Sequence, residues 1–149
     1  MLAGGKQYHV LAAVPSAPVK VLVADDSATI RQVVELVFRK RDVQVVSASS
    51  GRAALDLARR ERPDVILADL HMEPGDGLWL ARELGDESEG APVVILTRNA
   101  EAPPIDRIQA SGAAAHLPKP FEAQALIDLV ERVTSEEGWE DEAFSEPEP

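Results

Sequence analysis

The chain has 149 residues, 45% hydrophobic and 28% charged, which is the composition of an ordinary soluble globular protein rather than a membrane or wholly disordered one. It contains no cysteine, which excludes disulfide bonds and thiolate metal sites and is compatible with the cytoplasm. The net charge of −11 disfavours nucleic acid as a direct partner, because an acidic surface repels the phosphate backbone.

Composition divides the chain into three regions. Residues 1–19 lack periodicity and contain two glycines and two prolines, so we expect a flexible N-terminal tail. Residues 20–134 have the pattern of one folded domain. Residues 135–149 hold seven acidic residues and no Lys or Arg, which predicts a disordered tail. Trp139 and Phe144 in this tail either dock on the domain or a partner, or belong to a segment that only improves solubility.

The middle region alternates short apolar runs with segments whose apolar residues recur every three or four positions. Runs that are apolar at consecutive positions are typical of parallel strands covered on both faces by helices. The predicted strands are residues 21–24, 43–46, 65–68, 93–96 and 115–117.

Helices are predicted between and after these strands. Asp26 or Ser27 is available to cap the first helix, and Ser50 the second, which must end before Pro63. The third covers residues 77–84, the fourth is short, starts near Pro104 and ends by Gly112, and the fifth carries an apolar stripe over residues 123–133. Five βα units predict an α/β fold, a flavodoxin-like, doubly wound, five-stranded parallel sheet.

Polar side chains follow four of the five predicted strands. They are Asp25 and Asp26, Asp69, Thr97, and Lys119 with Pro120. Each alone has an ordinary explanation, such as a helix cap or a surface charge. Together they lie where an open parallel sheet binds its ligands, at the carboxyl ends of the strands.

Three carboxylates at one edge of a sheet need positive charge among them. Each pair repels by roughly 4 kcal/mol at 4 Å and an effective dielectric constant near 20. A lysine and a hard divalent cation such as Mg²⁺ supply that charge, and Mg²⁺ commonly bridges carboxylates to phosphate oxygens. The set therefore favours phosphoryl chemistry, with a carboxylate nucleophile, a metal, a lysine and a hydroxyl.

The sequence resembles the receiver domains of two-component response regulators, most closely the single-domain chemotaxis type. The matching stretches are VLVADDSATIRQVV, PDVILADLHMEPGDG, VVILT and GAAAHLPKPF, and they span about residues 19–134. The resemblance implies that Asp69 accepts a phosphoryl group from a histidine kinase or a phosphotransfer protein. It also implies that the chain signals by protein binding and turns over no foreign substrate.

The resemblance also assigns roles to the other residues at the strand ends. Mg²⁺ or Mn²⁺ would be bound directly by Asp26, Asp69 and the backbone carbonyl of His71, with Asp25 acting through water. Lys119 would bond a phosphate oxygen, and the Lys119–Pro120 peptide bond would be cis. Thr97 would move toward the phosphoryl group, and the ring of His116 would swing inward behind it.

The chain departs from the family pattern beside this site. Arg98 follows Thr97 where the family has a small residue, and it would either screen phosphodonors, bind phosphate oxygens or point to solvent. His71 and Asn99 occupy positions that influence the lifetime of the acyl phosphate in receivers. Glu73 stands where the family usually has proline, with Pro74 following.

Three functions remain open on the sequence. The leading hypothesis is a phosphorylatable receiver that is a monomer or a phosphorylation-dependent dimer. Its downstream target would bind the face formed by the fourth helix, fifth strand and fifth helix. The second is a pseudoreceiver, an interaction module that works without phosphorylation. The third, an aspartate-nucleophile phosphatase, is disfavoured because no D-x-D motif or substrate cap is evident. Nothing beyond residue 134 predicts a DNA-binding domain, so the chain either acts by protein binding or is a fragment of a longer regulator.

Overall fold

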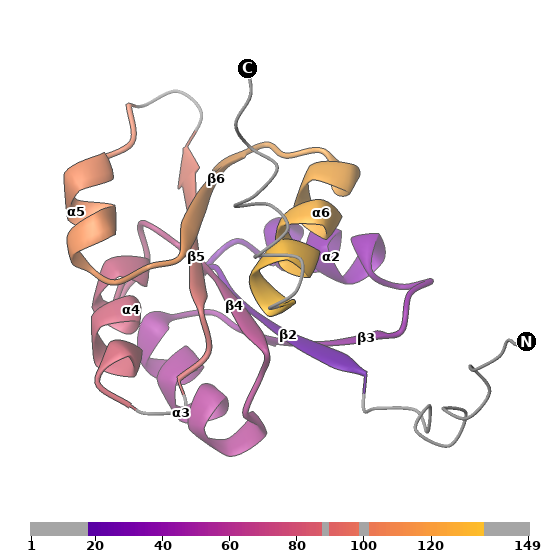
Figure 1. Cartoon of the computed structure of the whole chain (residues 1–149), viewed down its shortest axis with the longest axis horizontal. Coiled ribbons are helices and arrows are strands. Elements are labelled where there is room, and N and C mark those ends of the chain that lie inside the picture. The colour runs from indigo at the N-terminus through magenta and orange to yellow at the C-terminus, as the bar shows by residue number, and fades with distance from the viewer. Residues whose placement is uncertain (1–17, 88–89, 99–101, 136–149) are drawn as a thin grey trace, which may run out of the picture.

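Five parallel strands form a single sheet in the computed structural model, which describes residues 18–87, 90–98 and 102–135. In spatial order the strands are β3 (Val43–Ala48), β2 (Val19–Ala24), β4 (Val65–Asp69), β5 (Val93–Arg98) and β6 (Ala115–Lys119). Every neighbouring pair is parallel (Figure 1). The predicted flavodoxin-like sheet is confirmed. Trp139 and Phe144, and nearly all of both predicted tails, lie outside the described residues, so the domain boundaries stay predictions.

The helices cover the sheet in two layers (Figure 1). One face is covered by α3 (Gly51–Glu61), α4 (Gly77–Gly85) and α5 (Ile105–Ala110), and the other by α2 (Ala28–Val37) and α6 (Ala123–Thr134). Successive strand residues alternate between these two cores, as the two-residue period of a strand requires: Ile95 packs in the first and Leu96 in the second. Among the described residues, none of the helices combines the length and apolar character needed to cross a bilayer.

The predicted helix boundaries follow from their caps. The Ser27 hydroxyl accepts a hydrogen bond from the Ile30 amide at 3.3 Å, so Ser27 rather than Asp26 caps α2. Ser50 caps α3 in the same way, and this helix ends at Glu61, before Pro63. The short fourth helix is also as predicted: α5 follows Pro104 and ends two residues before Gly112, whose φ is +87°.

The strands are longer than their apolar runs. Asp69 and Lys119 are the last residues of β4 and β6 rather than the first residues after them, and Thr97 lies inside β5. Backbone ladder pairing continues past the last apolar side chain, because it depends on the neighbouring strand and not on the side chain. The edge strands β3 and β6 are also only partly buried, although their apolar sequences resemble those of the central strands.

The loop after β4 is fastened to the start of α3. The Gly51 amide donates to the Gly75 carbonyl at 2.9 Å, and the Arg52 amide donates to the Pro74 carbonyl at 3.0 Å. These bonds satisfy amides that a helix N-terminus otherwise leaves free. The Arg52 guanidinium lies 5.4 Å from the ring centroid of Trp79. The Glu73–Pro74 peptide bond in this loop is cis.

The close approach of the Gly75 carbonyl to Gly51 predicts that adding a methyl group at Gly51 destabilises the fold. A Cβ atom there would overlap the Gly75 carbonyl, and backbone cannot yield as a flexible side chain does. We expect Gly51→Ala to lower the free energy of unfolding by about 1–3 kcal/mol in urea titrations. The matched control is Gly85→Ala at the end of α4, where a Cβ meets no atom within 4 Å. That variant should be neutral or slightly more stable. Equal effects of the two substitutions would contradict the close approach at Gly51.

Candidate functional site

The ends of β2, β4 and β6 bring three predicted site residues into contact. Asp25 directly follows β2, while Asp69 and Lys119 end β4 and β6. Asp25 and Asp69 are buried, with exposed fractions of 0% and 2%. The Lys119 ammonium lies 3.1 Å from Asp25 Oδ2 and 3.3 Å from Asp69 Oδ1, so it forms an ion pair with both carboxylates.

Asp26 completes a cluster of three carboxylates. One oxygen from each of Asp25, Asp26 and Asp69 lies within 4.8 Å of the other two. Asp26 is exposed, so the cluster opens to solvent on its side. Within the parts of the chain that the structure describes, no other group of three or more Asp, Glu or His residues has metal-binding geometry.

Backbone amides hold the two buried carboxylates in place. The Ser27 amide donates to Asp25 Oδ1 at 2.9 Å, and the His71 amide donates to Asp69 Oδ1 at 3.3 Å. Sequence reasoning missed Arg31, whose Nη1 donates to the Asp25 backbone carbonyl at 2.7 Å. The available signal was spacing: Arg31 comes four residues after the Ser27 cap and therefore on the same side of α2.

Asp69 is short of positive charge. Burial raises the pKa of its carboxyl above the usual value of 3.8, and the negative charge of Asp25 raises this pKa further. The Lys119 ammonium and the His71 amide act in the opposite direction and do not offset the increase. The single ammonium group of Lys119 is therefore insufficient to offset the burial of Asp69 and its repulsion by Asp25.

The oxygen-only donor set and the shortage of positive charge fit a hard divalent cation. Mg²⁺ is bound in proteins through one or two carboxylates and retains several waters, which suits a cluster that is open beside Asp26. Mn²⁺ accepts the same ligands. Imidazole and thiolate ligands, which favour zinc, are absent from the cluster.

The remaining predicted residues lie around this cluster or outside the described region. Thr97 is buried with an exposed fraction of 2%, Arg98 is exposed and pairs in register with Lys119, and His116 pairs with Ile95. The Lys119–Pro120 peptide bond is cis. The side chain of His71 is exposed, and Asn99 lies outside the described residues.

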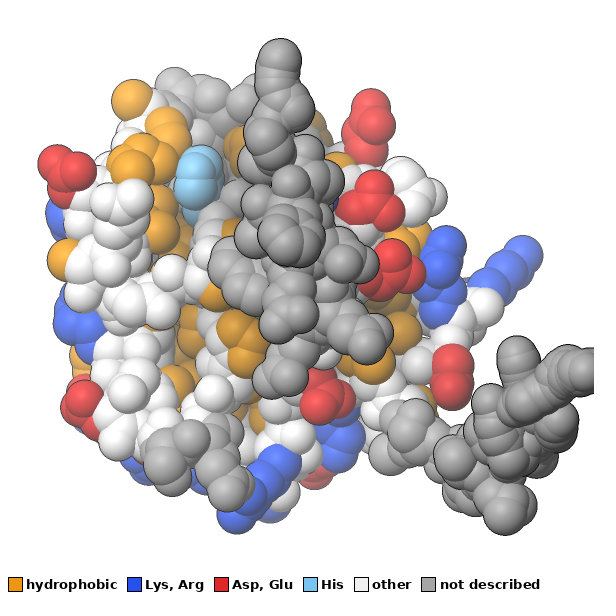
Figure 2. Space-filling model, in the orientation of Figure 1, with side chains coloured by type: hydrophobic (Ala, Val, Ile, Leu, Met, Phe, Trp, Pro, Cys, Tyr) orange, Lys and Arg blue, Asp and Glu red, His pale blue; other side chains and the backbone are white. Residues whose placement is uncertain are grey.

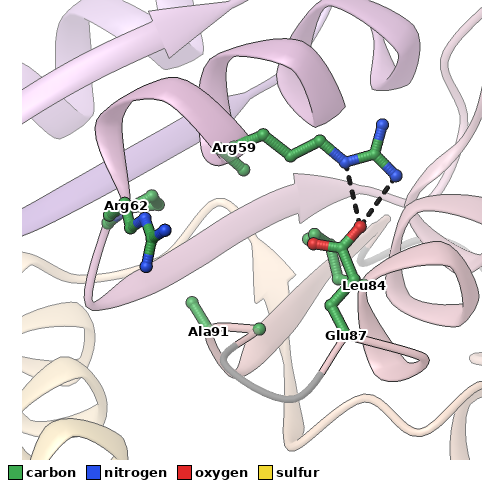
Figure 3. A pocket seen from close by; sticks show the side chains of 8 residues that line it. Arg59, Arg62, Leu84, Glu87 and Ala91 are labelled. Carbon is green, nitrogen blue, oxygen red and sulfur yellow. Dashed lines mark hydrogen bonds and ion pairs between the residues drawn. The ribbon is translucent and has the colours of Figure 1, made fainter.

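A hollow of about 450 Å³ lies away from the carboxylates, between the ends of α3 and α4 (Figure 3). Glu87 Oε2 accepts hydrogen bonds from Arg59 Nε at 2.9 Å and Nη2 at 2.7 Å across this hollow. Helices in this fold run antiparallel to the strands, so the C-terminal ends of α3 and α4 lie at the opposite edge of the sheet from Asp69. This hollow is therefore separate from the candidate site.

Sequence comparison matches residues 21–131 to the family described as the response regulator receiver domain. The chain is 33% identical over 113 residues to sporulation initiation phosphotransferase F of Bacillus subtilis, a match that covers 76% of this chain and 91% of the relative. It also matches longer regulators, of which it spans 24% to 58%.

Solved structures with the same fold include chemotaxis protein CheY4 of Vibrio cholerae. It is 34% identical, has a TM-score of 0.73, and the match covers 78% of this chain and 99% of that one. Another is the receiver domain of the sensor histidine kinase PA1611 of Pseudomonas aeruginosa, at 28% identity and a TM-score of 0.72, covering 79% and 98%. That structure has a magnesium ion coordinated in its active-site cleft.

The raised pKa of Asp69 predicts a pH-dependent gain from Asp69→Asn. The native state holds the Asp69 proton more tightly than the unfolded state, so ionised Asp69 lowers stability at neutral pH. This loss of stability disappears as the pH falls from above the raised pKa of native Asp69 to below the ordinary value of 3.8, because Asp69 is then protonated in both states. In urea titrations with a chelator, Asp69→Asn should raise the free energy of unfolding at neutral pH, and the gain should shrink as the solution is acidified.

The control is Asp56→Asn, which removes the same charge from an exposed position of α3. We expect no comparable pH-dependent gain in that variant. A gain from Asp69→Asn that stays constant between neutral pH and pH 4 or so would contradict the role assigned to burial and to Asp25.

Proposed function

This chain belongs to the family of response regulator receiver domains of two-component signalling, and on that premise we propose that Asp69 accepts a phosphoryl group. The donor would be a histidine kinase or a phosphotransfer protein. The observation that carries this proposal is the position of the Asp69 carboxylate, 3.3 Å from the Lys119 ammonium and within reach of the Asp25 and Asp26 oxygens. Receiver domains are signalling modules and do not turn over foreign substrates.

The chemistry requires an ionised Asp69. One carboxylate oxygen attacks phosphorus, the bond from phosphorus to the donor nitrogen breaks, and an acyl phosphate forms. Lys119 opposes the effect of burial on the Asp69 pKa, so it helps keep the nucleophile ionised. It then also lies close enough to bond an oxygen of the transferred group. Asp26, Asp69 and the His71 carbonyl would bind Mg²⁺ directly and Asp25 through water, and Mg²⁺ would neutralise charge on the phosphoryl oxygens.

Phosphorylation would change the surface through local charge. It adds about −1.5 to −2 charges and three acceptor oxygens at Asp69. The Thr97 hydroxyl would turn toward one of these oxygens, and His116 would move inward behind it. The altered face would be that of α5, β6 and α6, where a downstream protein, or a second receiver in a phosphorylation-dependent dimer, would bind. A kinase-coupled module of this kind would work in the cytoplasm.

A second candidate function rests on Arg98. This residue is exposed and pairs in register with Lys119 at the edge of the site. A guanidinium in this position is suited to occupying the place of a phosphoryl group or to screening donors. The chain would then be a pseudoreceiver that binds its partners without phosphorylation.

Intact-mass measurement with a small phosphodonor separates these two functions. With Mg²⁺ and acetyl phosphate, the wild-type chain should gain one phosphoryl group and Asp69→Asn should gain none. Asp56→Asn, which removes an exposed carboxylate from α3, should be labelled like the wild type. An adduct that survives Asp69→Asn would exclude Asp69 as the acceptor. If the wild type forms no adduct and Arg98→Ala does form one, the result would support the pseudoreceiver.

The proposed metal site predicts a loss of Mg²⁺ affinity in Asp26→Asn. Replacing a charged ligand with a neutral amide should weaken binding at least about tenfold in calorimetric titrations, which corresponds to roughly 1.4 kcal/mol. Because Asp26 is exposed, this substitution should leave folding intact. Asp56→Asn should bind Mg²⁺ as the wild type does. Equal affinities in Asp26→Asn and the wild type would remove Asp26 from the ligand set.

A further inference from the structure

The imidazole of His116 has a buried nitrogen without a hydrogen-bond partner. His116 lies on the edge strand β6 and is half-buried, and its Nδ1 atom is shielded from solvent. Among the described residues, it is the one buried side-chain nitrogen or oxygen with no partner. The Nδ1 atom of this imidazole is therefore desolvated without a compensating hydrogen bond.

Such a nitrogen makes the resting position of the ring unfavourable. In a neutral imidazole, Nδ1 is either a donor or an acceptor, and in both tautomers its burial without a partner costs free energy. A ring position that gives Nδ1 a partner is therefore favoured.

The Thr97 hydroxyl is such a partner. In the register of β5 and β6, Ile95 is opposite His116 and Thr97 is opposite Pro118. Side chains two residues apart on a strand share a face, so Thr97 and His116 project from the same face of the sheet. Strand spacing and rise place their Cα atoms about 8 Å apart on the diagonal, a separation that an imidazole and a hydroxyl span with one hydrogen bond.

A threonine hydroxyl can take part in two hydrogen bonds in series. It has one hydrogen to donate and two lone pairs that accept. When the hydroxyl of Thr97 donates to a phosphoryl oxygen on Asp69, its lone pairs stay free to accept from an imidazole N–H. Hydrogen bonds in such a chain polarise and strengthen one another.

We infer that His116 is a positioning residue, which in the phosphorylated state donates a hydrogen bond from Nδ1 to the hydroxyl oxygen of Thr97 and so orients that hydroxyl toward the phosphoryl group. The inference rests on the phosphoacceptor function proposed for Asp69. It assigns His116 a polar role in addition to the filling of space by its ring. An apolar ring at this position fills the space but orients no hydroxyl.

Three variants separate the polar role from the steric one. His116→Asn keeps a donor where Nδ1 stands, His116→Gln places one farther out, and His116→Phe keeps a ring without a donor. The probe is the phosphoryl analogue beryllofluoride with Mg²⁺. We expect His116→Phe to bind it about three- to tenfold more weakly than the wild type, the range of one net hydrogen bond. We expect His116→Asn to recover most of the affinity, and His116→Gln to recover less.

Nitrogen-15 spectra of the wild-type imidazole provide a readout that packing alone would not move. At about pH 8, where a free imidazole is neutral, addition of Mg²⁺ and beryllofluoride should shift the Nδ1 resonance of His116 to that of a protonated, hydrogen-bonded nitrogen. Unchanged imidazole resonances in the bound state, or a His116→Phe variant that binds as tightly as the wild type, would overturn the role of His116. Failure of the wild type itself to bind beryllofluoride would instead overturn the phosphoacceptor function.

Discussion

Repulsion among the carboxylates of Asp25, Asp26 and Asp69 is the constraint on which the rest of this structure depends. Two of these groups are buried, and one ammonium, that of Lys119, is in contact with both. The sheet holds the carboxylates together because Asp25 and Asp26 directly follow β2 and Asp69 ends β4, and these two strands are neighbours in the centre of the fold. The folding energy of the two hydrophobic cores maintains an arrangement of charge that the side chains alone would not adopt. The shortage of positive charge at this edge of the sheet is what supports the proposals that it binds a divalent cation and that Asp69 accepts a phosphoryl group.

At this edge of the sheet, the loop after β4 and the strand β6 differ in how strongly hydrogen bonds and packing restrain them. On the side of α3, amide bonds to Pro74 and Gly75 fasten the loop that follows Asp69. On the side of β6, the edge strand is only partly buried. Figure 2 shows the mixed apolar and polar surface of the molecule in the orientation of Figure 1. A partly buried edge strand has fewer packing contacts to lose when a side chain rotates. The movement proposed to follow phosphorylation would therefore be less costly at β6 than at the loop after β4, which must keep Asp69 in place.

The sequence was sufficient for the order and position of the strands, for the Ser50 cap, and for the convergence of Asp25, Asp69 and Lys119, because these depend on apolar runs and on where parallel strands end. It left the cap of α2 open between Asp26 and Ser27. It was not sufficient for strand length, since the backbone pairing that carries β4 through Asp69 depends on a neighbouring strand distant in sequence. It also could not show that Lys119 contacts both carboxylates, or that Arg31 binds the Asp25 carbonyl, because long side chains reach their partners through tertiary packing. The unpartnered Nδ1 of His116 depends on the surroundings of one atom, to which residue patterns are insensitive.

The resting contacts also limit which groups can drive a response. Moving a two-state equilibrium from 1:99 to 99:1 takes about 5.5 kcal/mol, and a hydrogen bond to a charged group contributes about 1.5–3 kcal/mol. Lys119 already bonds Asp25 and Asp69, so a bond from Lys119 to a phosphoryl oxygen replaces existing contacts and adds less than its full value. The net gain must come from groups that are poorly satisfied at rest. In the described part of the chain, the His116 Nδ1 atom meets that condition, and in the proposed phosphorylated state the Thr97 hydroxyl would connect it to the added charge.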